Sequence, residues 1–140
     1  MLGSAMRHGF VIGVALAALV ALILGAGSAS AQGGDGASVY DLAASPADHH
    51  GRCPTTVTFT ARISTFQTGP FSYRWERSDG VKGPVRSIPI AGYRDPKSAV
   101  DDSWRLTARH GETLHGWEKL HLLTPYDVLS DPAAFQQTCR

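Results

Sequence analysis

The 140-residue sequence has few of the motifs that most often carry chemistry. It has two cysteines, and they do not form a CxxC pair. No GxSxG or HExxH motif occurs, and no glycine-rich stretch links a strand to a helix, so nothing supports a serine hydrolase, a zinc protease or a phosphate loop. Paired carboxylates occur only at Asp101-Asp102, and neighbours on a strand point to opposite faces. We therefore expect no catalytic residues, no metal site, no cofactor and no enzymatic activity.

An excess of charge of one sign is also missing. The chain has 13 basic and 12 acidic residues, and Arg7 is the only one of these 25 within residues 1–31. Without that segment the two signs balance. A balanced chain has no general attraction for nucleic acid or for an anionic membrane. We expect no nucleic-acid partner.

One long apolar run is present, and it lies near the N-terminus at residues 11–24. Arg7 precedes it, and Ala29-Ser30-Ala31 forms an A-x-A pattern before Gln32. This layout predicts a secretory signal peptide over residues 1–31, with cleavage between Ala31 and Gln32. The expected location is secreted or periplasmic.

The same segment leaves one alternative open. The apolar run is shorter than the roughly 18 to 20 residues that span a bilayer. Residues 9–31 as a whole are long enough to remain as an uncleaved anchor, because glycine and serine are tolerated in a membrane. Membrane contact is expected only in that case.

Cys53 and Cys139 are the two cysteines, and an exported chain meets an oxidising compartment. A disulfide between them is therefore predicted. A metal-binding thiol pair is the alternative, but no close histidine spacing supports it.

Alternation with a period of two is the clearest structural signal. In residues 55–64, TTVTFTARIS, apolar and polar side chains alternate strictly, and residues 71–77, FSYRWER, alternate in the same way. Further strands are expected at residues 39–45, 85–92, 98–108, 113–123 and 134–140. Pro89 favours a sheet edge for the second of these. Residues 32–38 read as a flexible leader and residues 47–54 and 124–133 as loops, and no window predicts a helix.

The apolar positions of these strands predict one core. Its expected members are Val57, Phe59, Tyr73, Trp75, Trp104, Leu120 and Leu122. Trp117 has the opposite parity from Leu120 and Leu122, so it is the best candidate for an exposed tryptophan, unless Gly116 introduces a bulge.

Five stretches together carry a resemblance to a known family: CPTTVTFTARI, GPFSYRWERSDG, SWRL, GWEKLHLLTP and AFQQTC. They resemble the immunoglobulin-like domains of secreted bacterial proteins, which are similar to fibronectin type III and PKD-like sandwiches. The resemblance covers residues 53–140. It implies a single all-β, antiparallel sandwich of about seven strands over residues 39–140, preceded by the signal peptide.

The cysteines depart from the antibody pattern, in which both lie inside strands. Here Cys53 precedes the strand at 55–64 and Cys139 ends the last strand. In an immunoglobulin topology these two positions lie at the same end of the sandwich. The resemblance therefore implies that the disulfide ties the last strand to the start of the earlier one.

Polar residues on the predicted solvent-exposed faces of the strands suggest two interpretations. Arg74 and Glu76 should face Glu118, Lys119 and His121 on the neighbouring strand, where they would form cross-strand ion pairs. The functional hypothesis is a binding face for an unknown protein or carbohydrate, made of Arg62, Arg74, Trp117, Lys119 and His121. The loops at residues 78–84 and 109–113 are further candidate surfaces.

The expected function is an exported, non-catalytic immunoglobulin-like module, which binds protein or glycan or has a structural role at the cell envelope. One alternative is a small exported inhibitor of a protease or lytic enzyme. Another is a periplasmic metal-binding protein that uses the scattered histidines. An enzyme would need His110, Glu112 or His115 to converge in a pocket.

Overall fold

The computed structural model describes residues 33–34 and 36–140. The expected signal peptide of residues 1–31, its cleavage site between Ala31 and Gln32, and the alternative anchor at residues 9–31 lie outside the described residues. In the part of the chain that the structure describes, no helix has the length and apolar character needed to cross a membrane.

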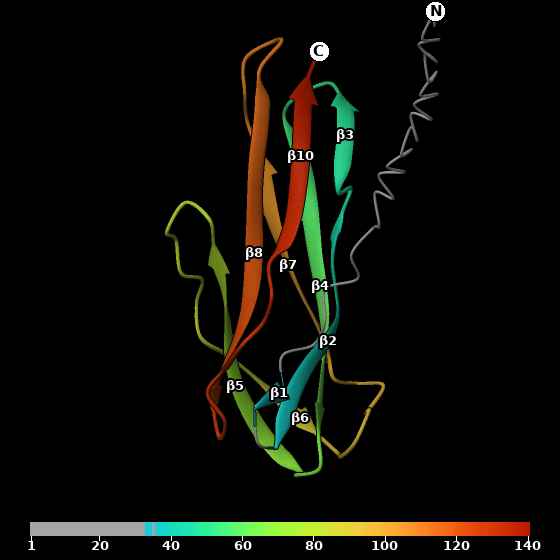
Figure 1. Cartoon of the computed structure of the whole chain (residues 1–140), viewed down its shortest axis with the longest axis vertical. Coiled ribbons are helices and arrows are strands. Elements are labelled where there is room, and N and C mark those ends of the chain that lie inside the picture. Colours follow the sequence, from blue (N-terminus) through green and yellow to red (C-terminus); the bar gives the residue numbers. More distant parts are fainter. Residues whose placement is uncertain (1–32, 35) are drawn as a thin grey trace, which may run out of the picture.

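Regular structure in the described residues consists of β-strands alone. They are β1 (Gly33–Gly34), β2 (Ala37–Ser45), β3 (Asp48–Gly51), β4 (Thr55–Thr65), β5 (Gly69–Arg77), β6 (Arg86–Ile90), β7 (Ala99–Leu106), β8 (Thr113–Thr124), β9 (Val128–Leu129) and β10 (Ala133–Cys139). One sheet has the order β1-β2-β4-β7. The other has the order β3-β10-β8-β5-β6, with β9 paired to β8. The two sheets pack face to face as an all-β sandwich (Figure 1).

The seven expected strands are all present. In β4, Val57 and Phe59 are buried while Thr56 and Thr58 are exposed, as strict alternation predicts. Strand β6, which contains Pro89, lies at the edge of its sheet. Proline has no backbone N–H to donate to a ladder, so an edge strand accommodates it.

Three short strands lie where the sequence predicts a leader or a loop. Strand β1 and the start of β2 fall within residues 32–38, β3 falls within 47–54, and β9 falls within 124–133. The loop assignments are wrong for these segments. Their pairing partners explain why, because β3 runs parallel to the last strand, β10, with Asp48 opposite Gln136. Local composition does not reveal a pairing between such distant segments.

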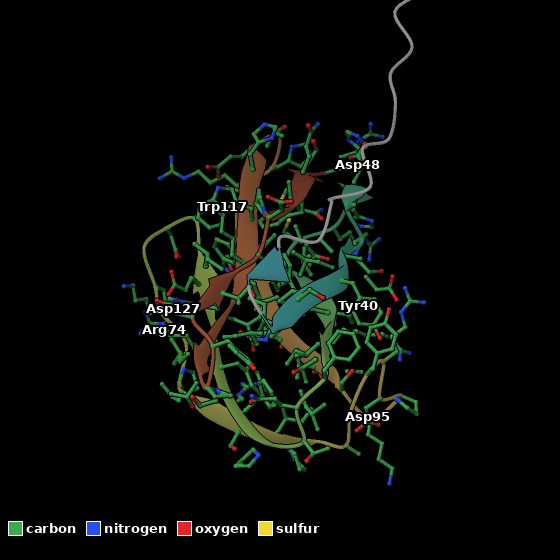
Figure 2. All side chains as sticks on the ribbon, turned by 60° about the horizontal axis from the view of Figure 1, so that its bottom comes forward. Tyr40, Asp48, Arg74, Asp95, Trp117 and Asp127 are labelled. Atoms are coloured by element: carbon green, nitrogen blue, oxygen red, sulfur yellow. A yellow bond between two sulfur atoms is a disulfide. The ribbon has the colours of Figure 1, made fainter. Side chains whose placement is uncertain are left out.

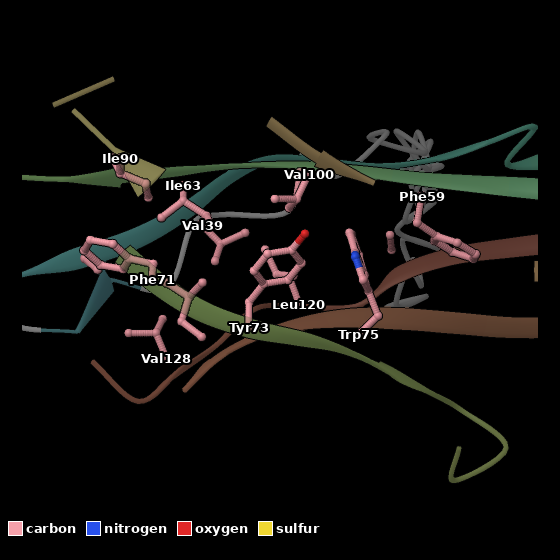
Figure 3. Packing of buried hydrophobic residues seen from close by; sticks show 14 of the residues in the cluster. Val39, Phe59, Ile63, Phe71, Tyr73, Trp75, Ile90, Val100, Leu120 and Val128 are labelled. Atoms are coloured by element: carbon pink, nitrogen blue, oxygen red, sulfur yellow. The ribbon is translucent and has the colours of Figure 1, made fainter. Parts of the chain in front are cut away.

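The core lies between the sheets and draws on both (Figure 3). Trp75 is only 2% exposed, and its ring centroid lies 6.3 Å from that of Phe59. Of the other expected core residues, those that are buried are Val57, Phe59, Tyr73, Leu120 and Leu122. Trp104 is partly buried and packs edge-on against Phe135, with the centroids 5.3 Å apart.

The predicted disulfide between Cys53 and Cys139 is confirmed, and their Cα atoms are 5.4 Å apart. It joins the segment before β4 to the end of β10, and so connects the two sheets. The bond indicates an extracytoplasmic location for the chain.

Strands β6 and β7 form the open side of the sandwich, each at the edge of its own sheet. Arg86 of β6 crosses this side. Its Nη1 donates to the backbone oxygen of Asp101, at 3.1 Å, and its Nη2 lies 3.5 Å from the Asp102 carboxylate. The exposed backbone edge of β7 is thus partly covered by a charged side chain, a common protection against edge-to-edge association.

Candidate functional site

Four of the five residues in the predicted binding face share one surface. Arg74 of β5 lies opposite His121 of β8, and Trp117 and Lys119 precede His121 on the same face of β8. Arg62 is the exception. It belongs to β4 in the other sheet, where its Nε lies 3.8 Å from the Asp41 carboxylate. A face that combines Arg62 with the other four is therefore wrong, because the two sheets present their outer sides in opposite directions.

Much of the charge on this surface is paired within the chain. Arg74 Nη2 lies 2.8 Å from Glu76 Oε1, and the same oxygen lies 2.8 Å from His121 Nδ1. The other ring nitrogen, Nε2, lies 2.6 Å from the Asp127 carboxylate. Figure 2 shows Arg74 and Asp127 on the same side of the molecule. The predicted cross-strand pairing is confirmed for Glu76 and His121.

The same contacts move two pKa values. The hydrogen bond from His121, together with Arg74, lowers the pKa of Glu76 even though burial opposes this. Burial of the His121 ring disfavours its charged form, but the hydrogen bonds to Glu76 and Asp127 outweigh this and raise the pKa of His121. The surface is a closed ion-pair network, so it offers few free charges to a ligand.

Glu118 is not part of this surface, contrary to the expectation. It has the parity of Leu120 and Leu122 and faces the interior, where its side chain is buried. Trp117 does face outward and is half-buried, and the Lys119 ammonium lies 5.0 Å from its ring centroid.

A different pair of aromatic residues is much more exposed. Phe66, in the β4–β5 loop, is 82% exposed, and Tyr93, in the β6–β7 connection, is 57% exposed. Their rings stack face to face, with centroids 5.0 Å apart and planes 6° apart. Two large apolar side chains from separate loops thus meet at one end of the sandwich, in solvent.

A cleft of about 160 Å³ lies beside this pair. It is lined by Gly36, Ala37, Ser38, Ser64, Thr65, Phe66 and Tyr93. The Thr65 hydroxyl fixes one wall, because it donates to the Gly36 carbonyl at 2.8 Å and accepts from the Gln67 amide at 3.1 Å. Gly36 itself has φ +113° and lies against the Tyr126 ring, where a Cβ atom would not fit.

The Tyr93 loop is held by its own hydrogen bonds. The Asp95 carboxylate accepts from the backbone amides of Ala91, at 2.8 Å, and Lys97, at 2.9 Å, and these bonds lower the pKa of Asp95. Asp95 marks this loop in Figure 2. Arg94 has φ +52° and its guanidinium lies 5.4 Å from the Tyr93 ring centroid. A side chain rarely adopts that backbone conformation outside a constrained turn.

The residues considered for catalysis or metal binding lie elsewhere. His110, Glu112 and His115 are all exposed and do not line the cleft. Glu112 accepts from the Arg109 amide at 2.9 Å, which closes a turn. Among the described residues, no group of three histidine, cysteine or acidic side chains is arranged to hold a metal ion.

Sequence reasoning missed Phe66 and Tyr93 because neither lies in an alternating segment. They are far apart in the sequence, in the turn-rich stretches TFQTGP and AGYRDP. The only local signal is a single aromatic residue surrounded by turn formers, and nothing in the sequence indicates that the two loops meet.

The sequence matches no protein-family model and no curated protein. Among solved structures, it is similar to the alkylpurine DNA glycosylase AlkC of Pseudomonas fluorescens bound to DNA containing an abasic site analogue. That match has 10% identity and a TM-score of 0.43, and covers 74% of this chain and 30% of the glycosylase chain. The cupredoxin domain of amoB from Nitrosocaldus yellowstonii is similar at 14% identity with a TM-score of 0.41, covering 75% of this chain and 88% of that domain. Neither likeness bears on function.

Proposed function

We propose that this chain is an exported, non-catalytic immunoglobulin-like module that binds a protein partner through the Phe66–Tyr93 end of the sandwich. The observation that carries the proposal is the exposed, stacked aromatic pair beside an apolar cleft. Single exposed apolar residues are ordinary on protein surfaces, whereas two that meet beside a cleft are typical of an interaction site.

The order of the strands supports the immunoglobulin-like assignment. Strands β2, β4 and β7 are neighbours in one sheet, and β10, β8, β5 and β6 in the other. The N-terminal segment contributes β2 to the first sheet and then β3 to the second, where β3 runs parallel to β10. Immunoglobulin-like sandwiches divide seven or more antiparallel strands in a comparable way.

Export is supported by two independent features. The pattern of residues 1–31 is that of a secretory signal peptide, which favours a secreted or periplasmic location. The Cys53–Cys139 bond requires an oxidising compartment to form and persist.

The geometry of the aromatic pair favours a protein over a carbohydrate. A platform for a sugar ring needs an open aromatic face, and the stacking of Phe66 on Tyr93 covers one of the two faces of each ring, so it leaves less free face than two separate rings would. The cleft beside them suits an apolar side chain, and the Arg94 guanidinium lies 5.4 Å from the centroid of the Tyr93 ring that helps to line it. Aromatic residues with a flanking arginine are the usual anchors of protein interfaces.

The lining of the cleft supports a non-catalytic role. Among the described residues that form it, Tyr93 is the only one with an ionisable side chain, and the remainder are glycine, alanine, serine, threonine and phenylalanine. General acid–base chemistry needs a group that titrates near the working pH.

Photo-crosslinking tests this function. A benzoylphenylalanine at position 66 should give one discrete protein adduct in the host cell, and the same group at the exposed position 58 on β4 should give none. Tyr93→Ser should abolish the adduct at position 66. Equal labelling from both positions contradicts a specific site. Binding to a glycan array that depends on Tyr93, without any protein adduct, would show that the partner is a carbohydrate.

A further inference from the structure

Arg77 and Glu118 face each other across the β5–β8 ladder. They are register partners, and both point to the inner side of the sandwich, as their parity with Trp75 and Leu120 requires. Side chains directly opposite on one face of an antiparallel pair are close enough to touch. The described residues nevertheless contain no ion pair between these two opposite charges.

Glu118 is the more unusual of the two. Its side chain is 0% exposed, and neither carboxylate oxygen accepts a hydrogen bond from the described residues. An ionised carboxylate in this position lacks both water and a donor, and the cost of such burial is high. Burial of this kind favours the neutral, protonated form of Glu118 over the carboxylate.

Arg77 is engaged elsewhere. Its Nη2 lies 2.5 Å from Asp79 Oδ2, and its guanidinium carbon lies 3.7 Å from the ring centroid of Trp104 on the opposite sheet. Its Nε is buried and has no hydrogen-bond partner among the described residues. The N–H at Arg77 Nε is thus a donor without a hydrogen-bond partner among the described residues, and Glu118 is the residue opposite Arg77 on β8.

The other charged groups near Glu118 come from three elements. Asp102 of β7 points inward and is held by Arg86 of β6, at 3.5 Å, while Asp79 lies in the β5–β6 loop. The inner side of β10 contributes Ala133, Phe135 and Gln137, which carry no charge. Arg77 is therefore the cation placed to pair with an ionised Glu118.

Asp79 connects Arg77 to the shape of the β5–β6 loop. Its second oxygen, Oδ1, accepts from the Val81 amide at 3.1 Å, and Arg77 and Val81 also share a backbone hydrogen bond of 2.9 Å. The loop carries two exposed apolar side chains, Val81 at 48% and Val85 at 61%. If Arg77 changes its partner, the contacts of Asp79 and Val81 in this exposed, partly apolar loop therefore change as well.

We propose that protonation of Glu118 determines the partner of Arg77, so that the side-chain contacts from Arg77 to Asp79 and from Asp79 to Val81 in the loop at residues 78–84 are kept only while Glu118 is neutral. When Glu118 loses its proton, the guanidinium turns from Asp79 to the buried carboxylate. Asp79 then loses its charged partner. Its carboxylate is no longer held in place by Arg77, so the hydrogen bond that it accepts from the Val81 amide is weakened. The O–H bond of the Glu118 carboxyl group breaks, its electron pair stays on the carboxylate, the proton leaves to solvent, and no other covalent bond changes.

The electrostatics place this change near neutral pH. Burial, helped by the negative charges of Asp102 and Asp79, raises the pKa of Glu118 to about 7, against the opposing effect of Arg77. A carboxyl group that titrates there responds to the difference between a neutral and a mildly acidic compartment.

NMR titration between pH 5 and 9 tests whether protonation of Glu118 is coupled to the loop. The chain is purified from the compartment in which its disulfide forms. The Glu118 side-chain carbon and the Val81 amide should share one midpoint near pH 7. Glu118→Gln should hold the Val81 amide at its low-pH position throughout. Asp79→Asn should lower the Glu118 midpoint, because one like charge is removed, and should uncouple the Val81 amide from it.

Asp127→Asn is the matched control, because it alters the His121 network on the outer face and should leave the Val81 transition unchanged. A Glu118 midpoint near its ordinary 4.5 overturns the proposal, and so does a Val81 transition that persists in Glu118→Gln. If Glu118→Gln does not fold, the parent chain decides: different midpoints for the Glu118 carbon and the Val81 amide contradict the coupling.

Discussion

The guanidinium carbon of Arg77 lies 3.7 Å from the centroid of the Trp104 ring, although the two residues belong to different sheets. A cation over an indole contributes about 0.5 to 2 kcal/mol, more where water is excluded. In a double-mutant cycle of Arg77→Met and Trp104→Leu, followed by urea unfolding, we expect a coupling free energy of about 1 kcal/mol. The half-buried pair Lys119 and Trp117 on the outer face, at 5.0 Å, is the control and should couple more weakly. A coupling free energy no larger than that of the control pair would contradict a stabilising contact between the two sheets at Arg77 and Trp104.

Trp75 should be the costliest tryptophan to truncate. It is almost fully buried and packs against Phe59, so Trp75→Ala removes many contacts and leaves a cavity. We expect a loss of about 3 to 5 kcal/mol in the free energy of unfolding. Trp117→Ala, at a half-buried position on the outer face, should cost about 1 kcal/mol or less. A Trp75→Ala variant as stable as the parent would contradict the core assignment.

Reduction of the disulfide should destabilise the chain strongly. The bond joins residues that are 86 positions apart, and closing such a loop restricts the unfolded chain by roughly 4 to 5 kcal/mol in the chain-entropy model. Thermal unfolding with and without dithiothreitol measures the effect, with Cys53→Ala/Cys139→Ala as the genetic counterpart. A difference below about 1 kcal/mol would contradict an important role for this bond.

Stability should decrease as pH rises from 5 to 8. Because the folded pKa of Glu118 is about 7 and its usual value is 4.5, the folded state keeps a proton that the unfolded state releases. The stabilisation is complete below pH 4.5 and is lost as pH rises through 7, by up to about 3 kcal/mol. The raised pKa of His121 acts in the same direction above its usual 6.5. Chemical unfolding at several pH values measures this dependence. The free energy of unfolding should change less with pH in Glu118→Gln than in the parent. His121→Asn should remove only the part of the decrease that occurs above pH 6.5.

The exposed aromatic pair should matter for binding far more than for folding. Stacked rings contribute about 0.5 to 1.5 kcal/mol beyond their burial, and both of these rings remain largely in solvent. Phe66→Ser and Tyr93→Ser should each change the free energy of unfolding by less than about 1 kcal/mol. A loss of several kcal/mol would indicate that the pair is part of the folded core, and would weaken the case for a binding site there.

The strands were predictable because alternation is local. Val57 and Phe59 on one side of β4 identify both the strand and its buried face from the sequence alone. The same rule does not say to which sheet a strand belongs, so it cannot separate Arg62 of β4 from the other four residues of the predicted face, which lie on the opposite sheet. Short strands such as β3 depend on a partner at the other end of the chain, so local sequence does not mark them.

Glu118 is a more instructive error. Its parity with Leu120 and Leu122 places it inside, yet its charge favoured the outer face. Here the periodic signal was right and the residue type misled, as happens where a protein buries an ionisable group at a special site. Phe66 and Tyr93 were out of reach for another reason, since only the folded arrangement of two loops brings their rings together.

The parallel pairing of β3 with β10 has a consequence for the order in which the chain becomes a domain. Strand β3 has no partner until residues 136–139 arrive, and Cys53 has no partner until Cys139 does. During synthesis or translocation, the sheet that contains β3, β10, β8, β5 and β6 is therefore incomplete until residues 136–139 arrive, whereas the β1-β2-β4-β7 sheet does not depend on them. Contacts of such long sequence separation slow folding and leave sheet edges open in the meantime. Strand β10 is thus the piece that closes this sheet, because it lies between β3 and β8 and pairs with both.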